Sequence, residues 1–192
     1  LFIAEHYPRC RIVAVSNSAT QRACIESECL RRGIRTVRVV TADMNGFEAG
    51  ERFDRIVSVE MFEHMRNWEL LLERIAAWLR PRGKLFVHVF CHKELAYPYV
   101  AEGSNDWMAR HFFTGGMMPS DGLLLRFQRH LRAERQWRTD GSHYRKTARA
   151  WLLNLDARRA AVLPVLALVY GRPEAHRWFR RWRMFFMACE EL

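Results

Sequence analysis

Residues 11–41 read RIVAVSNSATQRACIESECLRRGIRTVRVVT, and this stretch decides the fold class. The runs RIVAVS at its start and TVRVVT at its end are compact, β-branched and too short for helices, so they predict two strands. Residues 19–32 between them predict a helix, which Ser18 can cap and Gly33 can end. A strand, a helix of this length and a second strand indicate a right-handed crossover and a parallel strand pair.

The same alternation continues to residue 90. Residues 53–59 (FDRIVSV) and 84–90 (KLFVHVF) predict two more strands. A helix is predicted at 68–79 between them, stopped by Pro81 and Gly83. We therefore expect an α/β fold with a doubly wound, mostly parallel, Rossmann-like sheet. Ligands of such sheets bind beyond the carboxyl ends of the strands. The segments that this rule selects are 16–17, 43–44, 60–64 and 90–92.

The second half of the chain has a different pattern. Residues 92–120 show no periodic core pattern and are rich in aromatic residues and glycine, which is typical of a lid or binding loop. Helical patterns follow at 122–130, 144–170 and 173–190. No internal repeat is present, and no stretch rich in glycine, serine or proline separates two domains. We therefore expect a helical C-terminal cap on a single domain.

The composition narrows the class of protein. The 192 residues are 49% hydrophobic and 27% charged, the mixture of a globular protein that can bury a core. The longest apolar run, residues 160–170, is too short to cross a bilayer and contains Pro164. The N-terminal residues 1–7 (LFIAEHY) have no features of a signal peptide and read as the end of a helix.

The chain is strongly basic, with 31 Lys and Arg against 21 Asp and Glu and a formal net charge of +10. Such a balance suits nucleic acid, anionic lipid or an acidic cofactor. Nearly all of the positive charge is arginine spread over many segments. Residues 177–183 (RWFRRWR) place aromatic rings on one helix face and arginines opposite, which indicates an amphipathic surface helix. We expect no nucleic-acid partner and at most a peripheral contact with an anionic membrane.

Cysteine and histidine spacing argues against a metal site. The five cysteines include no pair with the two-residue gap of a zinc or redox motif, and the eight histidines form no HExxH motif. Free thiols are typical of a reducing compartment. We therefore expect a cytoplasmic protein without a bound metal.

Several motifs together resemble one methyltransferase family. The segments that carry the resemblance are 11–21, 42–44, 53–65, 88–97, 106–120 and 143–151, which include FEHM at 62–65, FCHKE at 90–94 and FFTGG at 112–116. They are similar to S-adenosylmethionine-dependent methyltransferases of the cyclopropane-fatty-acyl-phospholipid synthase superfamily. Within it they resemble most closely the amine-methylating, coclaurine N-methyltransferase-like branch.

The resemblance also implies how the chain is organised. The first strand and glycine-rich turn of the family would precede Leu1, and its closing strands would follow Leu192. We therefore expect residues 1–192 to be the interior of one catalytic domain, truncated at both ends. Within it, residues 1–91 would form the cofactor-binding core, and residues 92–192 the lid loop and helical substrate-binding region.

The resemblance implies S-adenosylmethionine as the cofactor. Ser16 and Gln21 would share the ribose hydroxyls, Asp43 would accept the adenine amine, and Met44 would pack on the ring. Turn chemistry offers an alternative, in which Ser16 is a strand-end turn residue and Asp43 forms an Asx turn. The cofactor-binding residues so implied are Ser16, Asn17, Gln21, Asp43, Met44 and Glu60.

Four ionisable residues are candidates for the chemistry, namely Glu63, His64, His88 and Tyr144. Glu63 with His64 would take or position the proton of an amine, and crowding beside Glu60 would shift pKa values. In cyclopropane-forming relatives, the positions matching Glu63, His88 and Tyr144 hold a bicarbonate ion that acts as general base. The residues alone also allow helix capping by Glu63 and His64, a satisfied core histidine at His88, and packing by Tyr144.

Aromatic side chains would surround the substrate and stabilise a cationic product by cation–π contact, or would simply pin the loop to the core. These expected substrate-binding residues are Phe90, Tyr97, Trp107, Phe112 and Phe113. The reaction implied is N-methylation of a small amine. The alternatives are cyclopropanation of unsaturated phospholipid acyl chains and a non-catalytic binding module. The oligomeric state stays open between a monomer and a homodimer.

Overall fold

The computed structural model describes residues 1–100, 102–103, 106–113 and 115–191, so Thr114 of the FFTGG motif lies outside the described residues. The chain forms two compact units. The first comprises Leu1–Asp54 with Ala77–Gly83, and the second Arg55–Ala76 with Lys84–Leu192. The expected division after residue 91 does not coincide with these units and stays a prediction.

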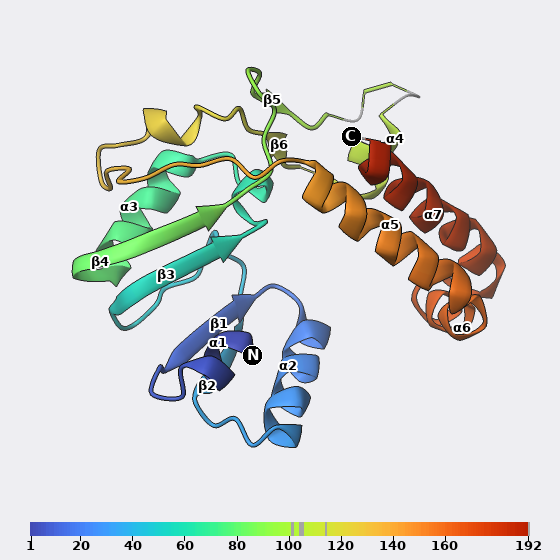
Figure 1. The fold of residues 1–192 in the computed structure, drawn as a ribbon, viewed down its shortest axis with the longest axis horizontal. Coiled ribbons are helices and arrows are strands. Elements are labelled where there is room, and N and C mark those ends of the chain that lie inside the picture. Colours follow the sequence, from blue (N-terminus) through green and yellow to red (C-terminus); the bar gives the residue numbers. More distant parts are fainter. Residues whose placement is uncertain (101, 104–105, 114, 192) are drawn as a thin grey trace. The chain divides into compact units, whose positions relative to one another are not determined.

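The first unit contains the strand–helix–strand segment that opened the sequence (Figure 1). It consists of β1 (Ile12–Ser16), α2 (Ala19–Arg31) and β2 (Val37–Thr41), preceded by α1 (Phe2–His6). β1 and β2 pair in parallel, from Ile12 opposite Val37 to Ser16 opposite Thr41. Each of these predicted elements is confirmed to within one residue at its ends.

The predicted caps of α2 are also present. The Ser18 hydroxyl accepts a hydrogen bond from the backbone N–H of Gln21 at 3.2 Å. Gly33 has a φ of +67°, which a residue without Cβ adopts readily at a helix end. The Ser18 cap fixes where α2 begins, close to the end of β1, and the backbone conformation of Gly33 allows the helix to end there.

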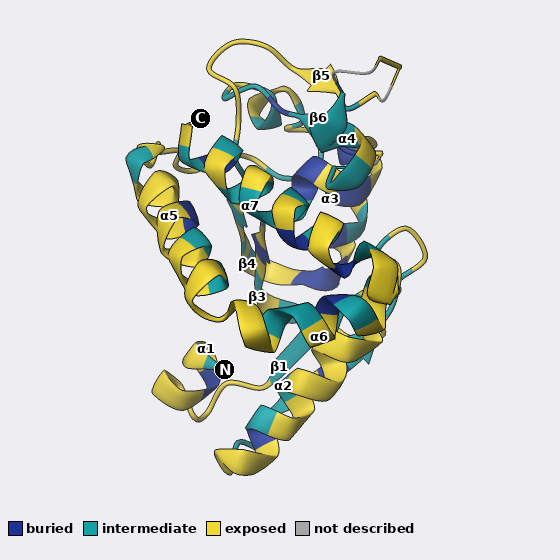
Figure 2. Ribbon diagram, turned by 90° about the vertical axis from the view of Figure 1, so that its right-hand side faces the viewer, coloured by how far each residue is buried: buried dark blue, intermediate teal, exposed yellow. Residues whose placement is uncertain are grey.

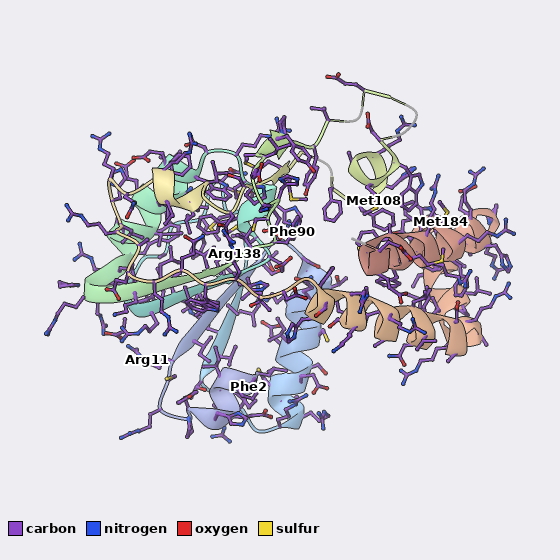
Figure 3. All side chains as sticks on the ribbon, turned by 45° about the horizontal axis from the view of Figure 1, so that its top comes forward. Phe2, Arg11, Phe90, Met108, Arg138 and Met184 are labelled. Atoms are coloured by element: carbon purple, nitrogen blue, oxygen red, sulfur yellow. The ribbon has the colours of Figure 1, made fainter. Side chains whose placement is uncertain are left out.

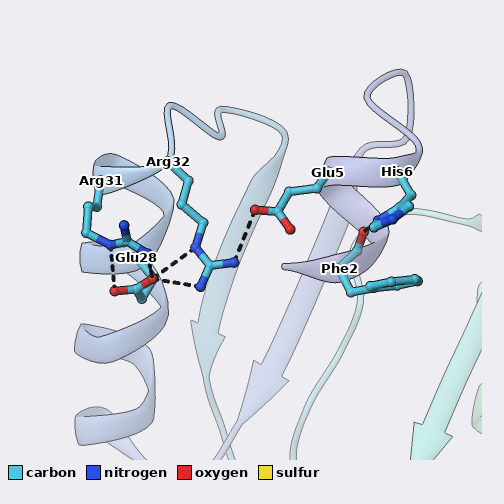
Figure 4. Close-up of polar contacts among 6 residues, drawn as sticks. All are labelled: Phe2, Glu5, His6, Glu28, Arg31 and Arg32. Atoms are coloured by element: carbon cyan, nitrogen blue, oxygen red, sulfur yellow. Dashed lines mark hydrogen bonds and ion pairs between the residues drawn. The ribbon is translucent and has the colours of Figure 1, made fainter.

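Ion pairs tie α1 to the end of α2 (Figure 4). Arg32 donates to Glu5 at 3.1 Å and to Glu28 at 2.9 Å, and Arg31 donates to Glu28 at 2.7 Å. The guanidinium groups of Arg31 and Arg32 lower the pKa of Glu28 to about 2. Because exposed ion pairs contribute little stability, these contacts orient α1 more than they hold the unit together.

A second pair of strands follows. β3 (Phe53–Val59) has the predicted bounds and pairs with β4 (Leu79–His88), and both arrows run in the same direction in Figure 1. β4 begins at Leu79 rather than at residue 84, directly after α3 (Trp68–Trp78). The helix predicted at 68–79 is thus confirmed to within one residue, whereas the strand begins five residues earlier than the predicted residue 84 and includes Pro81 and Gly83. Pro81 is exposed, and strands tolerate proline where no partner needs its missing N–H.

α3 supplies much of the buried apolar surface. Trp68, Leu71, Leu72 and Ile75 are each 2–3% exposed. Their spacing of three, four and seven residues places them on one face of the helix, which Figure 2 shows in dark blue. This face anchors the turn that leads from β3 into α3.

The segment expected to be a lid loop contains short elements. β5 (Tyr97–Pro98) and β6 (Met117–Met118) pair antiparallel, with α4 (Trp107–His111) between them. His92 forms an isolated parallel bridge to Ser120. The ends of this segment are therefore held together by backbone pairing.

The C-terminal region is helical, as expected. It contains α5 (Ser142–Ala157), α6 (Arg159–Tyr170), η3 (Arg172–Glu174) and α7 (Ala175–Glu191), and α5 and α7 run side by side. Leu166 of α6 and Phe179 of α7 share one buried cluster. No helix among the described residues combines the length and apolar character needed to span a membrane.

Two helix predictions were wrong. Residues 122–130 form only a single 3-10 turn, η2 (Leu124–Arg126). There the Gln128 side chain donates to the Leu125 carbonyl at 2.9 Å and accepts from Ala133 N–H at 3.1 Å, which stabilises a turn. The single helix predicted at 144–170 is divided, because Arg158 has a non-helical φ of −104° and ψ of 23°.

Candidate functional site

The carboxyl ends of β1 and β2 lie side by side in the first unit. Ser16 pairs with Thr41, and Ala42 N–H donates to the Ser16 carbonyl at 3.0 Å. The Ser16 hydroxyl donates to the Gln21 side-chain oxygen at 2.6 Å and accepts from Ser18 N–H at 3.1 Å. The tight connection from β1 into α2 thus brings the predicted pair Ser16 and Gln21 into contact.

Asp43 follows the end of β2 and is exposed. Its Oδ1 accepts from the backbone N–H of Asn45 at 2.8 Å and from the Asn45 side-chain amide at 2.9 Å. This is the Asx turn that was the structural alternative for Asp43. The turn holds the carboxylate at the strand end, and Met44 beside it is partly buried.

The polar groups at this sheet edge fit a nucleoside. Hydroxyl and amide groups of Ser16 and Gln21 can bond ribose hydroxyls, the Asp43 carboxylate can accept an exocyclic amine, and the Met44 thioether can pack on a flat ring. Asn17 is exposed at the same strand end and adds a second amide. The donor set therefore suits the nucleoside part of the expected cofactor.

The second unit carries the FEHM motif on a short 3-10 helix, η1 (Phe62–His64). Glu60, just before it, has a φ of +51°, a backbone conformation that non-glycine residues rarely adopt and that is often found at functional sites. The turn leaves Glu63 only 1% exposed, whereas His64 is exposed. The two residues expected to act together are therefore in different environments.

The Glu63 carboxylate is buried without a partner. Neither of its oxygens has a hydrogen-bond partner in the described part of the chain. Burial raises the pKa of Glu63 from 4.5 to about 8; its own backbone N–H opposes this shift, and the neighbouring Glu60 carboxylate adds to it. η1 has no side-chain cap, so Glu63 does not have the capping role that was its structural alternative. A carboxyl that titrates near neutral pH can accept or donate a proton.

His88 is paired with Glu60, and Tyr144 lies in the electrostatic surroundings of Glu60 and Glu63. His88 Nδ1 is 2.8 Å from Glu60 Oε1, and Glu60 N–H donates to the His88 carbonyl at 3.0 Å. The His88 side chain is half-exposed, so it is not a core histidine. Burial raises the pKa of Tyr144, and the charges of Cys189, Glu60 and Glu63 add to the shift. Tyr144 therefore lies within electrostatic range of both carboxylates.

Sequence reasoning missed Tyr99. Burial raises the pKa of Tyr99, with contributions from Tyr97 and from the Glu63 carboxylate. Its ring stacks on Phe113 with centroids 5.3 Å apart, and its hydroxyl donates to the Met118 sulfur at 3.9 Å. The tyrosines at 97 and 99, two residues apart on one face of an extended segment, were a signal that could have identified it.

The predicted substrate residues form two aromatic groups in the second unit. Phe90, which Figure 3 marks after the end of β4, contacts Phe113 at 6.0 Å, and Tyr97 contacts Tyr99 at 6.3 Å. These rings are close to Glu63 through Tyr99. Since Tyr99 also stacks on Phe113, the four rings form one connected group, of which Tyr99 lies within electrostatic range of the buried carboxylate.

The second group joins α4 to α7. Trp107 contacts Phe112 at 5.2 Å, and Phe112 stacks on Phe185 of α7 at 4.3 Å. Phe113 also contacts Phe185, at 5.9 Å, so the two groups meet there. An apolar groove of about 520 Å³ continues from Phe185 along α5, α6 and α7. Its aromatic lining residues are Trp151, Trp182, Phe185 and Phe186.

Comparison with known proteins shows which family the chain resembles. The model of the mycolic acid cyclopropane synthetase family matches residues 2–192. An (S)-coclaurine N-methyltransferase from Thalictrum flavum subsp. glaucum is 36% identical over 196 residues, covering 100% of this chain and 54% of that protein. The chain therefore spans about half the length of the curated relatives that it matches.

Solved structures agree with these matches. A crystal structure of coclaurine N-methyltransferase, bound to N-methylheliamine and SAH, superposes with a TM-score of 0.91 and 35% identity, covering 99% of this chain and 57% of the other. A cyclopropane synthase from Mycobacterium tuberculosis superposes with a TM-score of 0.73 at 17% identity, covering 97% and 67%, and shows the fold alone. The predicted methyltransferase fold is confirmed.

Proposed function

The chain belongs to the mycolic acid cyclopropane synthetase family, and from this premise we propose that the protein transfers a methyl group from S-adenosylmethionine to the nitrogen of a small amine. The observation that carries the proposal is the Glu63 carboxylate, which is buried, has no hydrogen-bond partner among the described residues and lies within electrostatic range of Tyr99. The N-methyltransferases among its relatives support an amine as the acceptor.

The cofactor would be held by the residues at the strand ends. When bound, S-adenosylmethionine supplies a methyl group on a sulfonium that is already activated toward nucleophiles. Ser16, Asn17 and Gln21 would bind the ribose, and Asp43 with Met44 would bind the adenine. Glu60 is the remaining proposed contact, and its pairing with His88 fixes its carboxylate.

Glu63 would handle the proton of the amine. An ammonium ion has no lone pair, so the acceptor nitrogen must lose a proton to act as a nucleophile. A carboxylate with an ordinary pKa would be a weak base for this task, whereas a pKa of about 8 lies near the operating pH, where general bases work best. His64, exposed beside Glu63, would pass the proton to solvent, and Tyr97, Tyr99 and Phe113 would stabilise a cationic product.

A specific observation supports a second function. Tyr144 lies within electrostatic range of Glu63, and His88 is linked to the same place through Glu60. In the cyclopropanation alternative these groups would hold bicarbonate, which would remove a proton as the ring closes on an unsaturated phospholipid acyl chain. Glu63 in its protonated form could donate a hydrogen bond to such an anion.

The proposal also includes expectations about the location of the protein and about its partners. A cytoplasmic location is supported by the free thiols of all five cysteines. A peripheral contact with anionic membrane is supported by the net charge of +10. A homodimer stays a prediction.

The test is where the methyl group goes. The natural full-length protein is incubated with methyl-labelled S-adenosylmethionine and, separately, with a panel of small primary and secondary amines and with vesicles of unsaturated phospholipid, each with and without bicarbonate. We expect label in one or more amines. Label only in the lipid fraction would replace the proposal by cyclopropanation. Cofactor binding without any label transfer would favour the non-catalytic binding module.

A further inference from the structure

Trp68, the first residue of α3, bonds both ends of the turn that carries Glu63. Its side chain is 2% exposed, and its indole N–H donates to the carbonyls of Phe62 and of Met65, each at 3.0 Å. Phe62 directly precedes Glu63, and Met65 directly follows His64. Met65 N–H also donates to the Phe62 carbonyl at 3.0 Å and closes the turn. One indole donor thus spans the whole of η1.

The packing around the turn leaves it little freedom. The Trp68 ring lies edge-on to Phe62, which is fully buried, with centroids 5.3 Å apart, and contacts Phe127 at 6.0 Å. The backbone at Gly116 also approaches closely, because a Cβ there would lie 2.5 Å from the Glu63 carbonyl. η1 is therefore in contact with α3 and with the chain next to β6.

These contacts supply what the turn lacks by itself. A three-residue 3-10 helix has poor hydrogen-bond geometry and little stability of its own. A buried carboxylate without a partner costs free energy, so an unrestrained turn would rotate Glu63 toward water. We propose that Trp68 is a positioning residue, whose indole N–H holds η1 so that the Glu63 carboxylate stays buried at the reaction site. The role in the reaction rests on the proposed function of Glu63.

The groups that share the surroundings of Glu63 come from several elements. Glu60 follows β3, Tyr99 follows β5, and Tyr144 lies on α5. His88, at the end of β4, acts through Glu60, and Arg66 donates to the carbonyls of Tyr99 and Gly116, each at 3.5 Å. Among the described residues, the Trp68 N–H donates to two backbone carbonyls and to none of these side chains. Its loss would therefore change the titration of Glu63 by moving the turn.

The variant Trp68→Phe keeps a buried ring and removes the N–H. Its matched control is Phe127→Leu, which disturbs the same apolar neighbourhood and leaves the N–H in place. The free energy of unfolding is measured as a function of pH for wild type, Trp68→Phe and Phe127→Leu. Each protein is measured with and without the additional substitution Glu63→Gln. The difference within each pair reports the titration of Glu63 in the folded protein.

In wild type and in Phe127→Leu, we expect this difference to change with pH up to about pH 8. In Trp68→Phe, the pH above which this stability difference stops changing should fall toward 4.5. Methyl transfer should also fall about ten- to hundredfold, because Glu63 is misplaced. An unchanged pH limit in Trp68→Phe would overturn the inference, even if the variant is less stable. A wild-type protein that methylates no amine would instead refute the proposed function, and the unfolding measurements would still test Trp68.

Discussion

Glu63 makes stability depend on pH in the direction opposite to that of a salt-bridged carboxylate. Because its pKa is raised from 4.5 to about 8, the folded protein keeps a proton that the unfolded chain loses between these values. The stability from this group is complete below about pH 4.5 and is lost as the pH rises through about 8. We predict that urea unfolding shows this loss, at most about 1.4 kcal/mol per pH unit. Glu63→Gln should abolish it, and an equal loss in the variant would assign the titration to another group.

Substitutions of His64 and of Tyr144 distinguish amine methylation from cyclopropanation. If an amine is methylated, His64→Ala should reduce turnover strongly, because the proton leaves through this exposed ring, whereas Tyr144→Phe should have a mild effect. Tyr170→Phe, whose ring stacks on Trp178 in the helical region, is the control for loss of a tyrosine hydroxyl. The reverse order of effects, with activity increased by added bicarbonate, would indicate ring formation instead.

The sequence predicts the identity of the site residues better than their environment. The pairing of Ser16 with Gln21 is a local contact across a short connection, and it is present as expected. The burial of Glu63 depends on Trp68 and on the close approach of Gly116, which is distant along the chain. The residues of the FEHM motif alone therefore allowed both capping and catalysis, and the burial of Glu63 could be learned only from the fold.

At the scale of elements, the loop after β2 permits a direct test of cofactor binding. Asp43→Ala removes the carboxylate proposed to accept the adenine amine and also the acceptor of the Asx turn. We predict weaker binding of S-adenosylmethionine in calorimetry. Glu26→Ala, which removes an exposed ion pair with Arg22 on α2, should leave the affinity unchanged. Wild-type affinity in Asp43→Ala would remove Asp43 from the cofactor site.

The strands were predicted more accurately than the helices of the second half. Short β-branched runs such as residues 53–59 contain their own signal, and β3 has those bounds. The division of residues 144–170 at Arg158 is a matter of tertiary packing, since α5 and α6 both contact α7. The apolar residues at 122–130 fit a helical period, but side-chain bonds of Gln128 stabilise a turn there.

At the scale of the whole molecule, the basic charge includes the arginines of α7, and three of these arginines contact acidic or aromatic side chains nearby. Arg177 pairs with Glu174, Arg183 pairs with Asp156, and Arg181 lies 4.7 Å from the centroid of the Trp178 ring. The aromatic face of the same helix packs against Phe112. The amphipathic pattern was therefore interpreted correctly from the sequence, but the element covered by its apolar face could be identified only from the fold.

The two compact units carry different parts of the proposed chemistry. Groups suited to a nucleoside lie in the first unit, at the ends of β1 and β2. The buried carboxylate and the connected aromatic group lie in the second. Variants of Ser16, Gln21 or Asp43 in the first unit should therefore change cofactor affinity, and variants of Glu63 in the second should change turnover.

The turnover of Glu63→Gln on an accepted amine, measured together with its affinity for S-adenosylmethionine, tests the role of the buried carboxylate most directly. General-base assistance contributes about 10²- to 10⁴-fold in rate, so we predict that turnover falls by this factor while cofactor affinity stays near that of wild type. Full turnover in Glu63→Gln would contradict the proposed role of Glu63.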